Sequence, residues 1–75
     1  MTMANGNEIR GIRQQLRMTQ EEFAHAIAVT ASTVNRWEND HAAPSRLARR
    51  AIEELLTRRG LNPADAAGAP MLSAN

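Results

Sequence analysis

The sequence predicts an all-α fold, a bundle of four to five short helices. Apolar residues recur three and four positions apart along most of the chain, the spacing that places them on one face of a helix. Each such segment follows an Asn, Thr or Ser, residue types that cap helix N-termini, and no strand-like alternation is visible. With 75 residues, the chain is long enough for one small domain.

The first predicted helix covers about residues 7–17. Its cap is Asn5 or Asn7, with Glu8 three residues after the first of them. Its apolar face consists of Ile9, Ile12 and Leu16. This spacing favours a short amphipathic helix with one side buried.

The second predicted helix covers about residues 19–28. It opens with "TQEE", a capping box in which the Thr19 hydroxyl accepts from the Glu22 amide and the Glu22 carboxylate accepts from the Thr19 amide. Its buried stripe consists of Phe23, Ala24 and Ile27. Because the box satisfies two backbone amides, the start of this helix is well defined by sequence.

The third predicted helix covers about residues 31–38. Thr30 is its cap, and Val34 and Trp37 lie three residues apart on one face. The link from the second helix is too short for the two helices to lie antiparallel, so a helix-turn-helix crossing is expected. The remaining side chains of "ASTVNRWE" are mostly polar and would face outward.

The fourth predicted helix covers about residues 45–59, capped by Ser45 and stopped by Gly60. Its apolar residues are Leu47, Ala48, Ala51, Ile52, Leu55 and Leu56. Residues 1–60 are therefore expected to form the domain. Residues 61–75 are expected to form a short, partly disordered tail with at most one further helical turn.

Composition excludes several classes of protein. The chain has no cysteine, so disulfides, thiolate metal sites and cysteine nucleophiles are unavailable. No apolar run approaches the roughly 18 residues of a membrane span, and the N-terminus lacks the features of a secretion signal, so we expect a cytoplasmic protein. No nucleophile–base pair, phosphate-binding loop or metal constellation is visible, so we expect no enzyme activity, metal or cofactor.

The stretch from Leu16 to Ser45 combines several features in a fixed order: Thr-Gln-Glu-Glu, an apolar residue and Ala, a Ser/Thr-rich helix that closes on Arg-Trp-Glu-Asn, and then Pro-Ser. In this order it resembles the lambda-repressor-like, or Xre-like, helix-turn-helix family, over most of residues 9–56. The resemblance implies a lambda-repressor-like bundle. It also implies a sequence-specific regulator of transcription, expected to be a dimeric repressor that binds double-stranded DNA.

The resemblance also assigns contacts with DNA. The third helix reads the major groove in this family, and its base-contacting positions are Ala31, Ser32, Thr33, Asn35 and Arg36. Arginine can bond guanine bidentately, asparagine suits adenine, and alanine or threonine can contact the thymine methyl group. The residues expected at phosphates are Thr19, Gln20, Thr30, Asn39, His41 and Arg46.

Three residues are expected to be structural. Trp37, three residues after Val34, is expected in the core rather than stacked on a base. The resemblance pairs Arg13 of the first helix with Glu38, a pair that would fix how the helices cross.

Two positions depart from the family pattern. Ala28 stands where glycine is common, and a left-handed backbone there would cost about 1 kcal/mol. Asn39 and Asp40 stand where the family usually has Asn-Gly. Both departures concern turns and leave the predicted fold unchanged.

Two other functions compete with a regulator of this kind. The chain could be an antitoxin-type protein that represses its operon and binds a toxin, or an interaction module that has lost DNA binding. The second is motivated by residues 19–44, whose four acidic residues against Arg36 give a net charge of −3. This charge predicts weak DNA binding by a monomer and a need for dimerisation. The candidate dimer contacts are Leu55, Leu56, Leu61, Met71 and Leu72.

Overall fold

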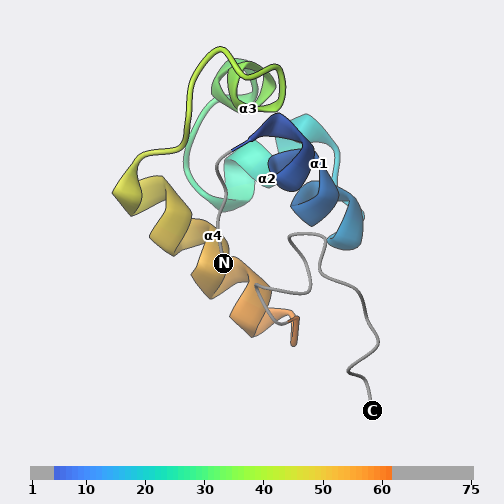
Figure 1. Ribbon diagram of the computed structural model, residues 1–75. Helices are drawn as coiled ribbons and strands as arrows, with labels where there is room; N and C mark the ends of the chain where they lie inside the picture. The colour runs from blue at the N-terminus through green and yellow to red at the C-terminus, as the bar shows by residue number, and fades with distance from the viewer. Residues whose placement is uncertain (1–4, 62–75) are drawn as a thin grey trace.

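Residues 5–61, the part of the chain that the computed structural model describes, form four helices and no strand. The helices are α1 (Gly6–Gln15), α2 (Gln20–Ala26), α3 (Ala31–Glu38) and α4 (Arg46–Arg58). α3 packs against both α1 and α2, and α4 runs below them in Figure 1. The all-α prediction is confirmed, and within these residues no helix is both long and apolar enough to cross a membrane. The helical turn expected after Gly60 lies outside the described residues.

Each helix begins after a capping residue, whose side chain accepts a hydrogen bond from a backbone amide that has no partner within the helix. The caps are Asn5, Thr19, Thr30 and Ser45, and each accepts a hydrogen bond from the amide three residues later. At α2 the capping box is complete, because the Thr19 amide also donates to the Glu22 carboxylate at 2.9 Å. All four caps are residues that the sequence proposes, and each stabilises its helix by roughly 0.5–2 kcal/mol.

Two residues past the end of each helix, the chain turns at a residue with positive φ. These residues are Arg17 (58°), Ala28 (62°), Asp40 (60°) and Gly60 (75°). At the end of α2 the Ala28 amide donates to the His25 carbonyl at 3.2 Å, and the Val29 amide donates to the Ala24 carbonyl at 2.9 Å. The same pair of bonds closes the other three helices. This is the Schellman pattern, which satisfies the last carbonyls of a helix.

These left-handed residues explain why α1 and α2 are shorter than the sequence predicts. The predicted helices at 7–17 and 19–28 include Arg17 and Ala28, whose positive φ values cannot continue a right-handed helix. Ala28 has the conformation for which the family commonly uses glycine. Nothing in the sequence around Arg17 predicts its left-handed conformation.

The apolar faces of the four helices meet in one core. Its buried residues are Ile9, Ile12, Leu16, Phe23, Ala24, Ile27, Val34, Trp37, Ala48, Ile52, Leu55 and Leu56. Trp37 is 5% exposed, so its expected place in the core is confirmed. It anchors α3, with Val34 beside it, to the rest of the bundle.

Two expectations about α4 are wrong. Leu47, expected in the apolar stripe, is 78% exposed. Leu55 and Leu56, expected as dimer contacts, are covered by the core of their own chain and cannot reach a partner. Leu61 is half-buried against that core, and the remaining candidates at positions 71 and 72 lie outside the described residues.

Replacing Ala28 with glycine should raise the free energy of unfolding by about 1 kcal/mol, because glycine has no Cβ to clash in the left-handed conformation. Ala28 is exposed, so no core contact is lost. Ala26→Gly, at the right-handed last residue of α2, is the control and should lower the free energy of unfolding by about 1 kcal/mol, because glycine is less favourable than alanine there and a contact with the core is lost. Urea unfolding followed by circular dichroism measures both. Equal destabilisation by the two substitutions would show that Ala28 is not strained.

Candidate nucleic-acid interface

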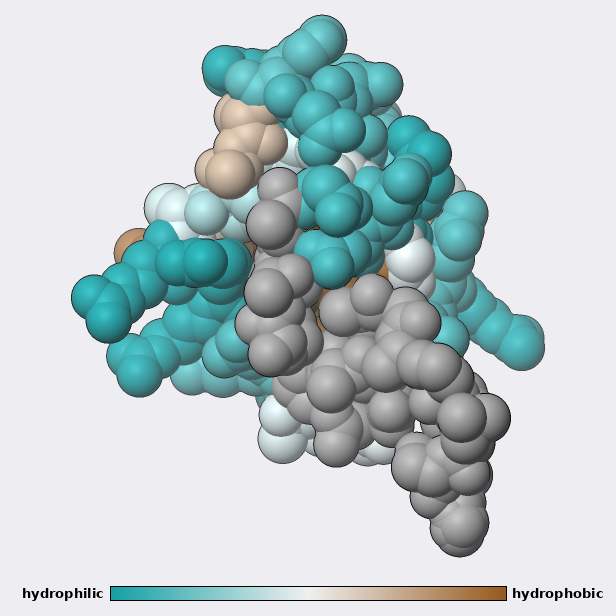
Figure 2. All heavy atoms as spheres, viewed as in Figure 1, coloured by the Kyte–Doolittle hydropathy of each residue, from teal (hydrophilic) through white to brown (hydrophobic). Residues whose placement is uncertain are grey.

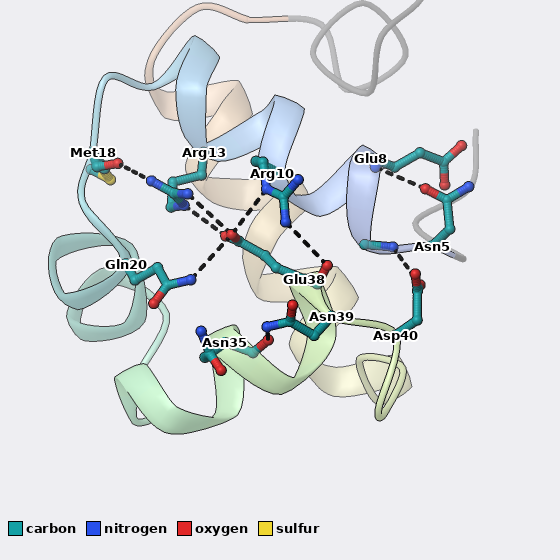
Figure 3. A network of polar contacts seen from close by, with 11 residues as sticks. Asn5, Glu8, Arg10, Arg13, Met18, Gln20, Asn35, Glu38, Asn39 and Asp40 are labelled. Carbon is teal, nitrogen blue, oxygen red and sulfur yellow. Dashed lines mark hydrogen bonds and ion pairs between the residues drawn. The ribbon is translucent and has the colours of Figure 1, made fainter.

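Glu38, the last residue of α3, joins three helices through one buried carboxylate. Only 2% of its side chain is exposed. Arg13 of α1 donates from Nε to Oε2 at 2.6 Å and from Nη2 to Oε1 at 3.0 Å. Gln20 of α2 donates from Nε2 to Oε1 at 3.2 Å (Figure 3). Arg10 also lies beside this carboxylate, and we call Arg10, Arg13, Gln20 and Glu38 the Glu38 cluster.

The Glu38 cluster keeps its carboxylate charged despite burial. Burial raises the pKa of Glu38, but hydrogen bonds from Arg13 and Gln20 and the charges of Arg13 and Arg10 lower it further, so the pKa lies below its ordinary value of 4.5. The hydrogen bond with Glu38 raises the pKa of Arg13 against the opposing effect of burial. Because the carboxyl pKa is lowered by folding, this contribution to stability is present above that ordinary value and is lost as the pH falls below it.

The start of α1 packs directly on the end of α3. A Cβ at Gly6 would overlap the carbonyl oxygen of Glu38, so a larger residue would push the helices apart. The Gly6 amide donates to Oδ1 of Asp40 at 2.7 Å, which places a carboxylate at the positive end of α1. Arg10 completes the contact, with Nε 3.5 Å from Oε1 of Glu38 and Nη2 donating to the Glu38 carbonyl at 3.4 Å.

The outer face of α3 is open. Ser32, Asn35 and Arg36 are exposed, and they lie within about 100° of one another at 3.6 residues per turn. The three buried residues of this helix occupy the opposite side. Figure 2 shows that the surface over α3, at the top of the view, is hydrophilic. Three of the five residues expected at bases are therefore freely accessible.

The other two residues expected at bases lie at the edges of this face. Ala31 is half-buried and packs against the core. Thr33 is half-buried, and its hydroxyl lies 2.9 Å from the hydroxyl of Thr30. Thr30 itself accepts from the Thr33 amide as the cap of α3. These side chains are partly committed to packing and capping.

Two of the residues expected at phosphates begin α2. The Thr19 hydroxyl accepts from the Glu22 amide at 3.0 Å, which leaves its own hydrogen available to a further acceptor. The side-chain amide of Gln20 donates one of its two hydrogens to Glu38, and the other remains available. Gln20 is thus held in position by the end of α3, a contact that the sequence does not reveal.

The remaining phosphate candidates follow α3. The Asn39 side chain donates to the Asn35 carbonyl at 2.8 Å (Figure 3). His41 is exposed in the loop, and Arg46 is exposed at the start of α4, to which the loop carries the chain (Figure 1). Among residues 5–61, no group of three or more His, Cys, Asp or Glu side chains could hold a metal ion.

Sequence reasoning missed Arg10 and Gly6. Arg10 precedes Arg13 by three residues and so shares its helix face, which was a usable signal for a second contact with Glu38. Gly6 is a glycine inside a helix, where it lowers stability unless another backbone approaches closely. The backbone that approaches Gly6 is that of Glu38, and Asp40, whose side chain accepts from the Gly6 amide, lies 34 residues away, too far along the chain for local patterns to identify.

Arg13→Met should lower the free energy of unfolding by about 3 kcal/mol, because it leaves Glu38 buried with incomplete compensation. The double variant Arg13→Met/Glu38→Leu should be more stable than this single variant, since neither charge then remains buried. Arg17→Met is the control and should change stability by less than about 0.5 kcal/mol, because Arg17 is exposed. Denaturant unfolding measures all three. A double variant less stable than Arg13→Met alone would contradict this account.

Comparison with known proteins places this geometry in a family. No curated protein and no solved structure matches the sequence. The helix-turn-helix family model matches residues 9–61, which include α2, α3, α4 and the whole Glu38 cluster. This range is more than half of the chain. The members of the family are DNA-binding regulators. The chain therefore belongs to the lambda-repressor-like, or Xre-like, helix-turn-helix family.

Proposed function

We propose that the protein is a sequence-specific repressor of transcription that places the outer face of α3 in the major groove of DNA and acts as a dimer. The observation that supports this most strongly is the contrast between the two sides of α3. One side exposes Ser32, Asn35 and Arg36, while the other is fixed by Trp37 and Glu38. A helix held rigidly on one side can present its side chains to bases with little further ordering cost.

The chemistry of the exposed side chains fits base edges. Arg36 has the planar fork that bonds O6 and N7 of guanine, and Asn35 can bond N6 and N7 of adenine. Ser32 can bond either kind of base. Ala31 and Thr33, at the edges of the face, would offer methyl groups to thymine. Arg36 is thus the residue expected to contribute most to discrimination between sequences.

The phosphate contacts follow from hydrogen-bond capacity that folding leaves unused. The Thr19 hydroxyl and the second amide hydrogen of Gln20 can both donate to phosphate oxygens. Because the Gln20 side chain also donates a hydrogen bond to Glu38, a contact between Gln20 and the DNA backbone would be coupled to the position of α3. The further phosphate contacts would come from Thr30, Asn39, His41 and Arg46.

The low positive charge of the DNA-facing part of the chain favours binding as a dimer. The Glu38 cluster balances Glu38 with two arginines, and Asp40 lies on the Gly6 amide, so part of the acidic charge of residues 19–44 is internally compensated. The remaining field is modest and would bind DNA weakly. A two-fold dimer would bind two half-sites about 34 Å apart, and occupation of a promoter in this way would exclude polymerase.

Selection of bound sequences from a random DNA pool, followed by mobility-shift titrations, tests this proposal. Arg36→Ala should weaken binding to the selected site by about 1–3 kcal/mol and change binding to unrelated DNA less, because it removes a base contact. Arg58→Ala removes the same charge near the end of α4 and should leave the discrimination unchanged. If the wild type and Arg36→Ala bind all DNA equally weakly, readout by α3 is refuted.

A further inference from the structure

Asn5 and Gly6 form the one Asn-Gly pair in the sequence. Such a pair can react within the chain, because the backbone nitrogen of the glycine can attack the side-chain carbon Cγ of the asparagine and close a five-membered ring. Glycine favours this reaction because it has no side chain to hinder the attack and because its backbone is unusually free. Both reacting groups lie where the start of α1 packs on the end of α3. The pair is therefore a candidate modification site at a contact between two helices.

The fold holds both reacting groups in other hydrogen bonds. Oδ1 of Asn5 accepts from the Glu8 amide at 2.9 Å, which fixes the side chain over the first turn of α1 (Figure 3). Gly6 is buried, and its amide donates to Oδ1 of Asp40 at 2.7 Å. The Gly6 nitrogen must give up its proton in the attack, and a carboxylate beside it opposes the negative charge that would form. The folded chain is therefore expected to react only when this first turn opens.

We propose that Asn5 is a site of self-modification, at which the chain converts this asparagine into aspartate and isoaspartate, and that the hydrogen bond from Gly6 to Asp40 limits the rate. A bond forms between the Gly6 nitrogen and Cγ of Asn5, and Nδ2 leaves as ammonia with the proton that the Gly6 nitrogen gives up. Water then opens the ring and returns a proton to that nitrogen. Addition of water at Cγ leaves aspartate, and addition at the main-chain carbonyl carbon leaves isoaspartate, in which the chain runs through Cβ and Cγ. The reaction needs no DNA, so it does not rest on the proposed function.

The two products have different consequences for the fold. Aspartate at position 5 keeps a cap at the start of α1 and adds a negative charge where the helix dipole favours one. Isoaspartate instead adds one backbone carbon before Gly6, where even a single Cβ would overlap the Glu38 carbonyl. The Gly6 amide then loses its place on Asp40. Isoaspartate is therefore expected to separate the start of α1 from the end of α3 that carries Glu38.

Peptide mapping of the full chain by mass spectrometry, during incubation at constant pH and temperature, tests the site. Asn5 should react at least about tenfold faster in guanidinium chloride than in the native wild type, because unfolding removes both protecting hydrogen bonds. Asn7 is exposed in the same helical turn but is followed by Glu8, whose side chain hinders the attack, so it is the internal control and should react several-fold more slowly than Asn5 in the denaturant. Equal rates for Asn5 with and without denaturant, or no reaction at Asn5 in denaturant, would overturn the proposal.

Two variants test the protecting contact and its consequence separately, with circular dichroism confirming that each is folded at the start. Asp40→Asn keeps a residue that tolerates positive φ and removes the charge, so the native variant should convert Asn5 several-fold faster than the native wild type. Asn5→Ser keeps a cap on α1 but cannot react, so its free energy of unfolding should stay constant during incubation. The isoaspartate form of the wild type, purified after incubation, should unfold at a lower denaturant concentration than the aspartate form. An unchanged rate in Asp40→Asn would overturn the role of Asp40, and product forms of equal stability would overturn the effect on α1.

Discussion

Glu38 ends α3 with a carboxylate that is almost entirely buried and receives hydrogen bonds from Arg13 on α1 and Gln20 on α2. A buried charge is tolerated only where its partners are complete, and here the bidentate arginine and the amide supply them. Because these partners come from two other helices, the position of α3 is tied to both. The open polar face of α3 can therefore keep one orientation although the helix has only eight residues.

The rest of the fold is built from local devices that set where each helix begins and ends. A domain of this size has a small core, so capping does much to determine where its helices begin and end. Side-chain caps at four N-termini and Schellman endings at four C-termini keep the helices short. The left-handed turn at Ala28 then sends the chain from α2 across into α3 within a few residues. α3 is thus oriented by the turn at Ala28 and fixed by Glu38, its last residue.

The sequence predicts these local devices well because their partners lie within a few residues. Thr19 and Glu22 form the box that "TQEE" indicates, and Thr30 caps α3 as expected. The family resemblance supplies the pair of Arg13 with Glu38, which local spacing alone does not identify. The contacts of Gln20 with Glu38 depend on how helices cross, and no periodicity encodes that angle.

Leu47 shows where periodicity misleads. It precedes Ile52 by five residues, which places it about 140° from the centre of the buried face at 3.6 residues per turn. Because Leu47 lies four residues before Ala51, helical spacing alone assigns it to the apolar stripe, although here it is open to solvent. Leu55 and Leu56 on the inner side of α4 are buried in the core, whereas Leu47 on its outer side is not.

We propose above all that the outer face of α3 is the surface that reads DNA. An amide correlation spectrum of the ¹⁵N-labelled protein, titrated with a selected duplex, tests it most directly. The largest shifts should fall within residues 30–36, together with Thr19 and Gln20. Amides of α3 that remain unchanged in a saturated complex would contradict it.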